Sequence, residues 1–134
     1  CDISSSKLQK LSETFWPGPL TIVLPVNDLL PKELNNGSGF IGFRVPNHYF
    51  TKTIIEKLGK PITGTSANIS NIPPSKNILE IISTFKKTVS TIVDIDCGKE
   101  THSSTVIKID KNESIDILRQ GPITLDKIKE TINN

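Results

Sequence analysis

Apolar positions along the chain follow two different periods, one typical of helices and the other of strands. Where apolar residues recur every three or four positions, the pattern predicts a helix. The segments with this pattern are 4–14, 47–58, 77–85 and a last one that begins after Thr124. We expect Gly59 to end the second helix, because glycine readily adopts the left-handed conformation that closes helices.

Short runs rich in β-branched and apolar residues lie between these helices and predict strands. The predicted strands are 20–25, 40–45, 62–65, 91–95, 104–109 and 115–118, with a helical turn near 29–34. Helices that alternate with strands indicate an α/β fold. The last two strands are separated by a short turn around Asn112, so we expect part of the sheet to be antiparallel.

The segment 61–75, PITGTSANISNIPPS, joins a short predicted buried strand to a cluster of small polar residues. Hydroxyls, amides and backbone N–H groups at a strand end can form an anion-binding concavity, and such sites commonly lie at the carboxyl ends of strands in α/β folds. Pro73 and Pro74 then exclude regular structure. An ordinary polar turn before the next helix has the same composition. Local composition therefore leaves both interpretations open.

Composition places the chain among globular proteins with one core. It has 134 residues, with 35% hydrophobic residues but only 5% aromatic ones, so Ile, Leu and Val must form the core. A net charge of +2 without a basic block argues neither for nor against nucleic-acid binding. No apolar run approaches the roughly 20 residues of a membrane helix. Cys1 and Cys97 form neither a metal motif nor a disulfide framework, so we expect a reduced, cytoplasmic protein.

The chain contains no Met and begins at Cys1, so we expect a processed chain or a fragment. A lipidation site at Cys1 would need a leader segment, and none is visible. Of the 16 Lys and Arg residues, only Arg44 and Arg119 are arginines. Arginine retained in a Lys-rich chain is expected where a planar, permanently charged fork is needed, although two arginines can also remain by chance.

Five sequence blocks occur in an order that resembles a known family. They are FWPGPLTIVLP (15–25), GFRVPNH (42–48), PITGTSANIS (61–70), SSTVIKI (103–109) and ILRQGPI (117–123). Together they resemble the YrdC-type family of threonylcarbamoyl-AMP synthases, which act in tRNA modification. The resemblance covers the whole chain but only the carboxyl-terminal two-thirds of the family domain. It implies a single YrdC-like domain over residues 1–134 that lacks its amino-terminal segment.

The resemblance implies a twisted, mixed parallel and antiparallel sheet with flanking helices around a basic cavity. It also implies a nucleotidyltransferase that joins ATP, L-threonine and bicarbonate into threonylcarbamoyl-AMP and releases pyrophosphate. Mg²⁺ would accompany ATP, bound mainly by the phosphates. A separate machinery would transfer the threonylcarbamoyl group to tRNA, and the basic cavity makes transfer RNA or double-stranded RNA a further candidate partner.

The residue roles that the resemblance implies fall into two groups. Arg44 would clamp the carboxylate of threonine, because a guanidinium fork matches a carboxylate bidentately. Thr65 and Ser66 would complete the threonine site. The ATP site would contain Ser66, Asn68, Ser104 and Arg119, with Ser75 as a further candidate. No catalytic side chain and no protein metal ligand are assigned, because nucleotidyl transfer depends on positioning and charge neutralisation.

The sequence also departs from the family pattern. Phe40 stands where many members carry Thr, and Pro74 stands where many carry a nucleotide-contacting Ser. The family's PTxTVYG-like strand and KxR motif are absent from this sequence, so we expect the chain alone to be inactive or very weak.

Other polar residues are expected to be structural. Asp94 and Asp96 are interpreted as solvated or capping residues, and His48 and His102 as turn residues. Two alternatives to the synthase stay open: a carbamoyl-transfer domain of a hydrogenase-maturation protein, and a non-enzymatic RNA-binding module.

Overall fold

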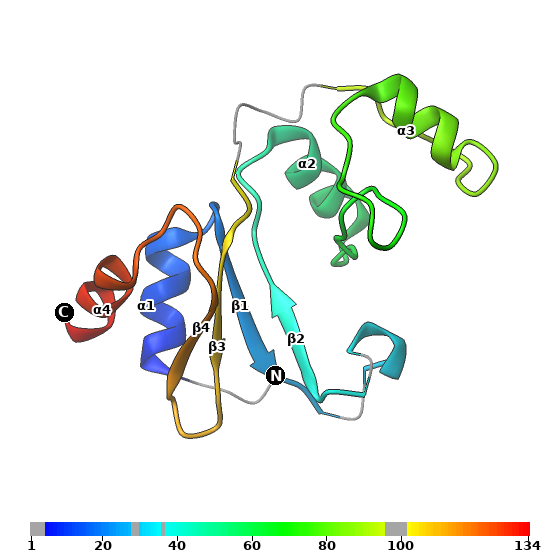
Figure 1. Ribbon diagram of the computed structural model, residues 1–134. Helices are drawn as coiled ribbons and strands as arrows, with labels where there is room; N and C mark the ends of the chain where they lie inside the picture. Colours follow the sequence, from blue (N-terminus) through cyan, green and yellow to red (C-terminus); the bar gives the residue numbers. More distant parts are fainter. Residues whose placement is uncertain (1–4, 28–29, 36, 96–101) are drawn as a thin grey trace. The chain divides into compact units, whose positions relative to one another are not determined.

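The computed structural model describes residues 5–27, 30–35, 37–95 and 102–134. They form two compact units (Figure 1). Unit 1 comprises Cys1–Ile54 together with Lys99–Asn134, and unit 2 comprises Ile55–Gly98. The assignment of residues 1–134 to a single domain stays a prediction.

A four-stranded mixed sheet forms the centre of unit 1. Its strands are β1 (Leu20–Pro25), β2 (Phe40–Phe43), β3 (Thr105–Ile109) and β4 (Ile115–Arg119), in the spatial order β2-β1-β3-β4. The two central strands, β1 and β3, are parallel, and each outer strand is antiparallel to its neighbour. The predicted α/β class and the mixed sheet, including the antiparallel pair around Asn112, are confirmed.

The core of unit 1 lies between one face of this sheet and two helices, α1 (Ser6–Phe15) and α4 (Leu125–Asn133), which Figure 1 shows side by side on that face. Alternate residues of the central strands point into it, as a period of two requires. The buried apolar side chains are Leu11, Leu20, Ile22, Leu24, Ile107, Ile109, Ile123 and Ile128. Burying each of the large ones contributes about 1.5–3 kcal/mol relative to leaving it exposed. Because α1 and α4 cover this face of the sheet, they leave only the opposite face uncovered.

Side-chain hydroxyls cap both helices of the unit 1 core. The Thr124 hydroxyl accepts a hydrogen bond from the Lys127 N–H and caps α4. Ser5 caps α1 in the same way through the Leu8 N–H. Such caps satisfy backbone donors that a helix leaves without partners at its first turn. Helix α1 ends at Phe15, and its C-cap is Trp16, whose extended conformation agrees with its place before a proline.

Unit 2 is largely irregular apart from its helices. The unit boundary falls within α2 (Tyr49–Leu58), which Gly59 closes with a φ of 63° as predicted. Helix α3 (Ile78–Phe85) is capped by the Asn77 side chain, which accepts from the Leu79 N–H at 2.9 Å. Neither helix contains a fully buried residue.

The expected turn near residues 29–34 is a short 3₁₀ helix, η1 (Lys32–Leu34), in unit 1.

Two predicted strands are wrong. Residues 62–65 and 91–95 have irregular conformation, and the expected buried position Ile62 is 45% exposed. β-branched composition is a weak signal, because a strand also needs a neighbour with which its backbone can pair. In the described part of unit 2 no strand offers such pairing. The strand predicted over 40–45 is also shorter, because Val45 instead accepts a hydrogen bond from the Gly18 N–H at 2.9 Å.

Cys1, Leu29, Asp96 and Cys97 lie outside the described residues. Among the helices that are described, none has the length and apolar character needed to cross a bilayer.

Candidate substrate-binding site

Three of the predicted site residues lie at one end of the unit 1 sheet. Because β1 and β3 are parallel while β2 and β4 run against them, the first residues of the central strands lie at the same end as the last residues of the outer strands. Ser104 immediately precedes β3, Arg119 ends β4, and Arg44 follows β2. The fold therefore brings together three predicted site residues that are 15 to 75 positions apart in sequence.

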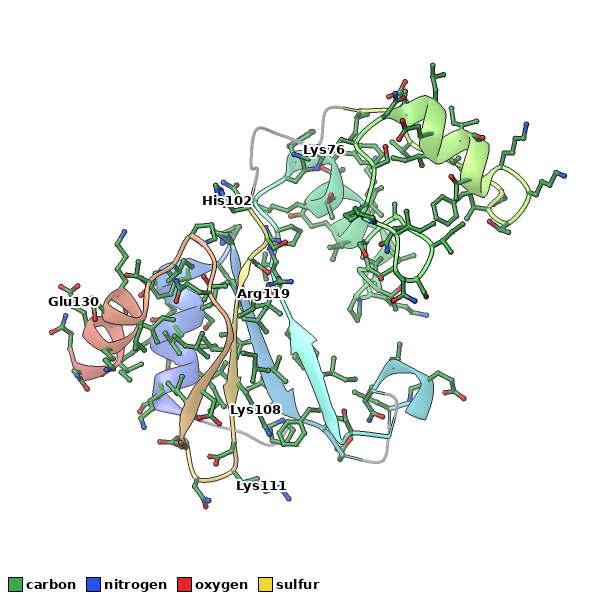
Figure 2. The ribbon with its side chains drawn as sticks, in the orientation of Figure 1. Lys76, His102, Lys108, Lys111, Arg119 and Glu130 are labelled. Carbon is green, nitrogen blue, oxygen red and sulfur yellow. The ribbon has the colours of Figure 1, made fainter. Side chains whose placement is uncertain are left out.

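Arg119 is held along one edge of its guanidinium group by Ser104. Its Nε donates to the Ser104 carbonyl oxygen and its Nη2 donates to the Ser104 hydroxyl, both at 3.1 Å. Ser104 is only 7% exposed, whereas Arg119 belongs to the exposed residues. Figure 2 shows Arg119 at the far end of β4 from Lys111, which lies in the β3–β4 turn. Two hydrogen bonds to one residue fix both the position and the plane of this charge.

Thr21 is a third member of this cluster and was not predicted as a site residue. Its Oγ1 lies 2.8 Å from the Ser104 Oγ, within hydrogen-bonding distance. Thr21 is the second residue of β1, where a threonine is simply a good strand former. Nothing local in the sequence marks its contact, because its partner is 83 positions away.

A buried threonine supports the same cluster from the core side. The Thr105 Oγ1 accepts from the Gly121 N–H at 3.1 Å and the Ile123 N–H at 3.0 Å, and it donates to the Ile123 carbonyl at 2.9 Å. These hydrogen bonds attach the loop after β4 to the first residue of β3. Ser104 is therefore backed by an ordered loop rather than by solvent.

Arg44 is held by the turn that precedes β1. Its Nε donates to the Gly18 carbonyl oxygen at 2.9 Å, and the Gly18 N–H donates to the Val45 carbonyl at 2.9 Å. A Cβ atom on Gly18 would fall 2.4 Å from the Phe15 carbonyl oxygen, so the turn depends on glycine there. Three strand spacings of about 4.8 Å separate the backbones of β2 and β4, so the two arginines start about 14 Å apart.

The remaining predicted residues lie in unit 2, around the loop at residues 65–75. Thr65 and Ser66 are exposed. The Asn68 amide nitrogen donates to the carbonyls of Ile69 at 3.1 Å and Ile72 at 2.8 Å, which closes the loop. Its Oδ1 is buried without a hydrogen-bond partner among the described atoms. Asn68 thus organises the loop and leaves one acceptor to be satisfied.

Ser75 lies at the edge of the same loop and is bonded within it. Its hydroxyl donates to the Glu80 carboxylate and accepts from the Asn77 N–H at 2.9 Å. Together with Asn68 and Glu80 it lines a small, mostly apolar cavity of about 130 Å³. The structure therefore places Ser75 in the turn before α3, where it binds the N-cap residue Asn77 and Glu80 in the first turn of the helix.

Other candidates have structural positions. The His48 Nδ1 lies 3.0 Å from the Thr51 Oγ1 at the start of α2, consistent with the predicted turn role. Phe40 lies at the opposite end of β2 from Arg44, and the Lys108 Nζ is 3.9 Å from the centre of its ring. Asp94 is exposed in the irregular segment 91–95. Within the described residues, no three metal-ligating side chains gather in one place.

Comparison with known proteins assigns the fold to a family. Residues 1–121 match the model of the Sua5/YciO/YrdC domain, described as telomere recombination. The chain belongs to the Sua5/YciO/YrdC family. Two relatives named threonylcarbamoyl-AMP synthase are each 33% identical to it. The one from Pyrococcus abyssi matches over 127 residues, which is 92% of this chain and 36% of that protein. The one from Photobacterium profundum covers 89% of this chain and 62% of that protein.

Solved structures of the family have the same fold. Sua5 from P. abyssi, solved in complex with L-threonine, is 32% identical and superimposes with a TM-score of 0.81 over 98% of this chain and 38% of its own. YciO from Escherichia coli, at 21% identity, has a TM-score of 0.76 over 95% of this chain and 61% of its own, and supports the fold alone. The chain thus spans 36 to 62% of the length of these relatives.

Proposed function

We propose that the full-length protein synthesises threonylcarbamoyl-AMP from ATP, L-threonine and bicarbonate, releasing pyrophosphate. The observation that carries this proposal is the pair of arginines, each held by hydrogen bonds, at one end of the unit 1 sheet. The reaction needs two anionic groups close together, a carboxylate and a polyphosphate. The relatives named threonylcarbamoyl-AMP synthase support this activity over a hydrogenase-maturation domain.

Arg44 is proposed to bind the carboxylate of threonine. The bond from its Nε to Gly18 restricts the plane of the guanidinium group. A restricted fork loses less conformational entropy when it forms a bidentate pair with a carboxylate. The exposed hydroxyls of Thr65 and Ser66 are proposed to complete the threonine site.

Arg119 and Ser104 are proposed to form part of the ATP site. Arg119 supplies a permanent positive charge to the phosphates, and Ser104 holds that charge in place. Ser66, Asn68 and Ser75 remain proposed nucleotide ligands. Asn68 would offer its buried Oδ1 to a donor group such as an amine, because an amide oxygen only accepts hydrogen bonds.

The chemistry needs positioning more than side-chain nucleophiles. The amine of threonine adds to bicarbonate with loss of water, which gives a carbamate. A carbamate oxygen then forms a bond to the α-phosphorus of ATP while the bond to pyrophosphate breaks. Fixed positive charges stabilise this transfer by neutralising the phosphate oxygens. Mg²⁺ would enter with ATP, bound by phosphate oxygens, since the described residues offer no cluster of carboxylates.

Use of the product would place the protein in tRNA modification, with transfer of the threonylcarbamoyl group by a separate machinery in the cytoplasm. Direct binding of transfer RNA or double-stranded RNA is a second candidate property. A filter-binding assay with structured RNA across a salt series tests it. RNA binding that is indifferent to ATP and threonine would favour a non-enzymatic module.

The decisive experiment supplies the full-length protein with ATP, L-threonine and bicarbonate and follows pyrophosphate release. We expect release that requires threonine. Release at the same rate without threonine would refute the proposal. Threonine replaced by its methyl ester serves as a control, because the ester lacks the carboxylate that Arg44 is proposed to bind.

A further inference from the structure

Thr21 has no role in the proposed reaction, yet its hydroxyl belongs to the hydrogen-bonded group around Ser104 and Arg119. It is 2.8 Å from the Ser104 Oγ, which in turn receives the Arg119 Nη2 at 3.1 Å. Three polar groups from β1, the start of β3 and the end of β4 thus form one continuous chain across the sheet. Thr21 is only partly exposed, and its methyl group faces Gly42 on β2.

The chemistry of Arg119 determines which group donates in the hydrogen bonds that join Arg119, Ser104 and Thr21. A guanidinium group only donates hydrogen bonds, so the Ser104 Oγ must accept from Arg119. The Ser104 hydroxyl proton then needs an acceptor of its own, because this residue is 7% exposed and has little access to water. The Thr21 Oγ1 is the acceptor within reach.

We infer that Thr21 is a positioning residue that fixes the guanidinium plane of Arg119 by accepting the Ser104 hydroxyl proton. Donation runs from Arg119 to Ser104 and from Ser104 to Thr21. Hydrogen bonds in such a head-to-tail chain strengthen one another, because a hydroxyl that donates is a better acceptor. The inner edge of the Arg119 guanidinium group, formed by Nε and Nη2, is therefore fixed by Ser104.

The outer edge of Arg119 is then presented in a fixed orientation. In the part of the chain that the structure describes, Nη1 makes no hydrogen bond, while Nε and Nη2 are bound to Ser104. This edge of the guanidinium group can donate to an anionic oxygen. The assignment of that oxygen to a nucleotide phosphate rests on the proposed function. Thr21 acts on the substrate only through Ser104 and Arg119.

The test compares Thr21→Val, Thr21→Ser and the control Thr131→Val in the full-length protein. Valine matches the shape of threonine but cannot accept a hydrogen bond, whereas serine keeps the hydroxyl. Thr131 lies in α4, away from this cluster, and its hydroxyl bonds to the Lys127 carbonyl in its own helix. Two readouts are needed: calorimetric Kd values for ATP and for L-threonine, and NMR of the arginine side-chain N–H groups, with the Arg119 signals assigned by their loss in Arg119→Lys.

For Thr21→Val we expect ATP to bind about three- to tenfold more weakly, the size of one hydrogen bond. Threonine binding should change less than twofold, because Arg44 is held by a different contact. Thr21→Ser and Thr131→Val should behave as the wild type. The same Thr21→Val change in a Ser104→Ala background should have no further effect, because the intermediate group is already missing.

The NMR readout separates this inference from the proposed function. Thr21→Val should speed rotation of the Arg119 guanidinium group while leaving that of Arg44 unchanged, whether or not ATP binds. Unchanged Arg119 motion in folded Thr21→Val, or an equal loss of affinity in the Ser104→Ala background, would overturn the positioning role. Slow Arg119 motion in a wild-type protein that fails to bind ATP would support the positioning role and refute the proposed function.

Discussion

Gly121 lies so close to Thr105 that a Cβ atom on it would fall 2.4 Å from the Thr105 backbone nitrogen. The same atom would lie 2.5 Å from the Ser103 carbonyl oxygen. Both neighbours are backbone atoms, which cannot rotate away as a flexible side chain would. The loop after β4 therefore has to carry glycine at this position for the start of β3 to remain in place.

Gly121→Ala is expected to destabilise the protein by about 1–3 kcal/mol, because overpacking against backbone forces the two segments apart. Urea unfolding of the full-length protein measures this change. Gly64→Ala is the matched control, since a Cβ there meets nothing within 4 Å and no positive φ is involved. Equal stability of the two variants would contradict the close packing.

Arg44→Lys and Arg119→Lys form a reciprocal pair. The first is expected to raise the Kd for L-threonine about tenfold or more, because the point charge of lysine loses the bidentate fork. The second should raise the Kd for ATP by a similar factor. Each variant should change binding of the other substrate by less than about threefold, and equal effects on both substrates in either variant would contradict the separate roles.

Asn68→Ala is expected to loosen the loop of unit 2, because it removes the two bonds to the Ile69 and Ile72 carbonyls. Hydrogen exchange of the amides in residues 66–72 should become about five- to tenfold faster, as expected when about 1 kcal/mol of local stability is lost. Asn68→Asp should behave alike, since a carboxylate cannot donate to carbonyls. Asn47→Ala, at an exposed position before α2, serves as the control.

Lys108 and Phe40 are expected to stabilise each other across β1. A double-mutant cycle of Lys108→Ala and Phe40→Ala should give a coupling free energy of about 0.5–1 kcal/mol, the size of a partly exposed cation–π contact. Phe40→Leu keeps apolar bulk without the ring and should lose the same coupling. A coupling of zero by denaturant unfolding would show that the contact contributes nothing in solution.

The sequence predicted the parts of the fold that depend on local signals. Strand β1 was predicted with its observed bounds, because a run of β-branched and apolar residues that follows Pro19 and ends at Pro25 marks it clearly. The segment 62–65 has similar residues, but strand formation depends on a neighbour that local composition does not encode.

In the candidate site, too, some residues could be predicted from local signals and others only from the fold. Arg44 and Arg119 stood out because arginine is scarce in this chain. Their common location at one end of the sheet follows from the antiparallel outer strands, which only the strand order reveals. Thr21 lies within the block FWPGPLTIVLP (15–25) but was not predicted as a site residue, because its significance comes from one contact with Ser104.

The strand order β2-β1-β3-β4 also determines what can change in this protein without cost to the site. The separation of the backbones that carry the two arginines is set by the number of strands between them and by the spacing of hydrogen-bonded strands. It does not depend on the length of the connections at the opposite end of the sheet. The turn at residues 110–114 could therefore gain or lose residues while the backbones that carry Arg44 and Arg119 kept their separation.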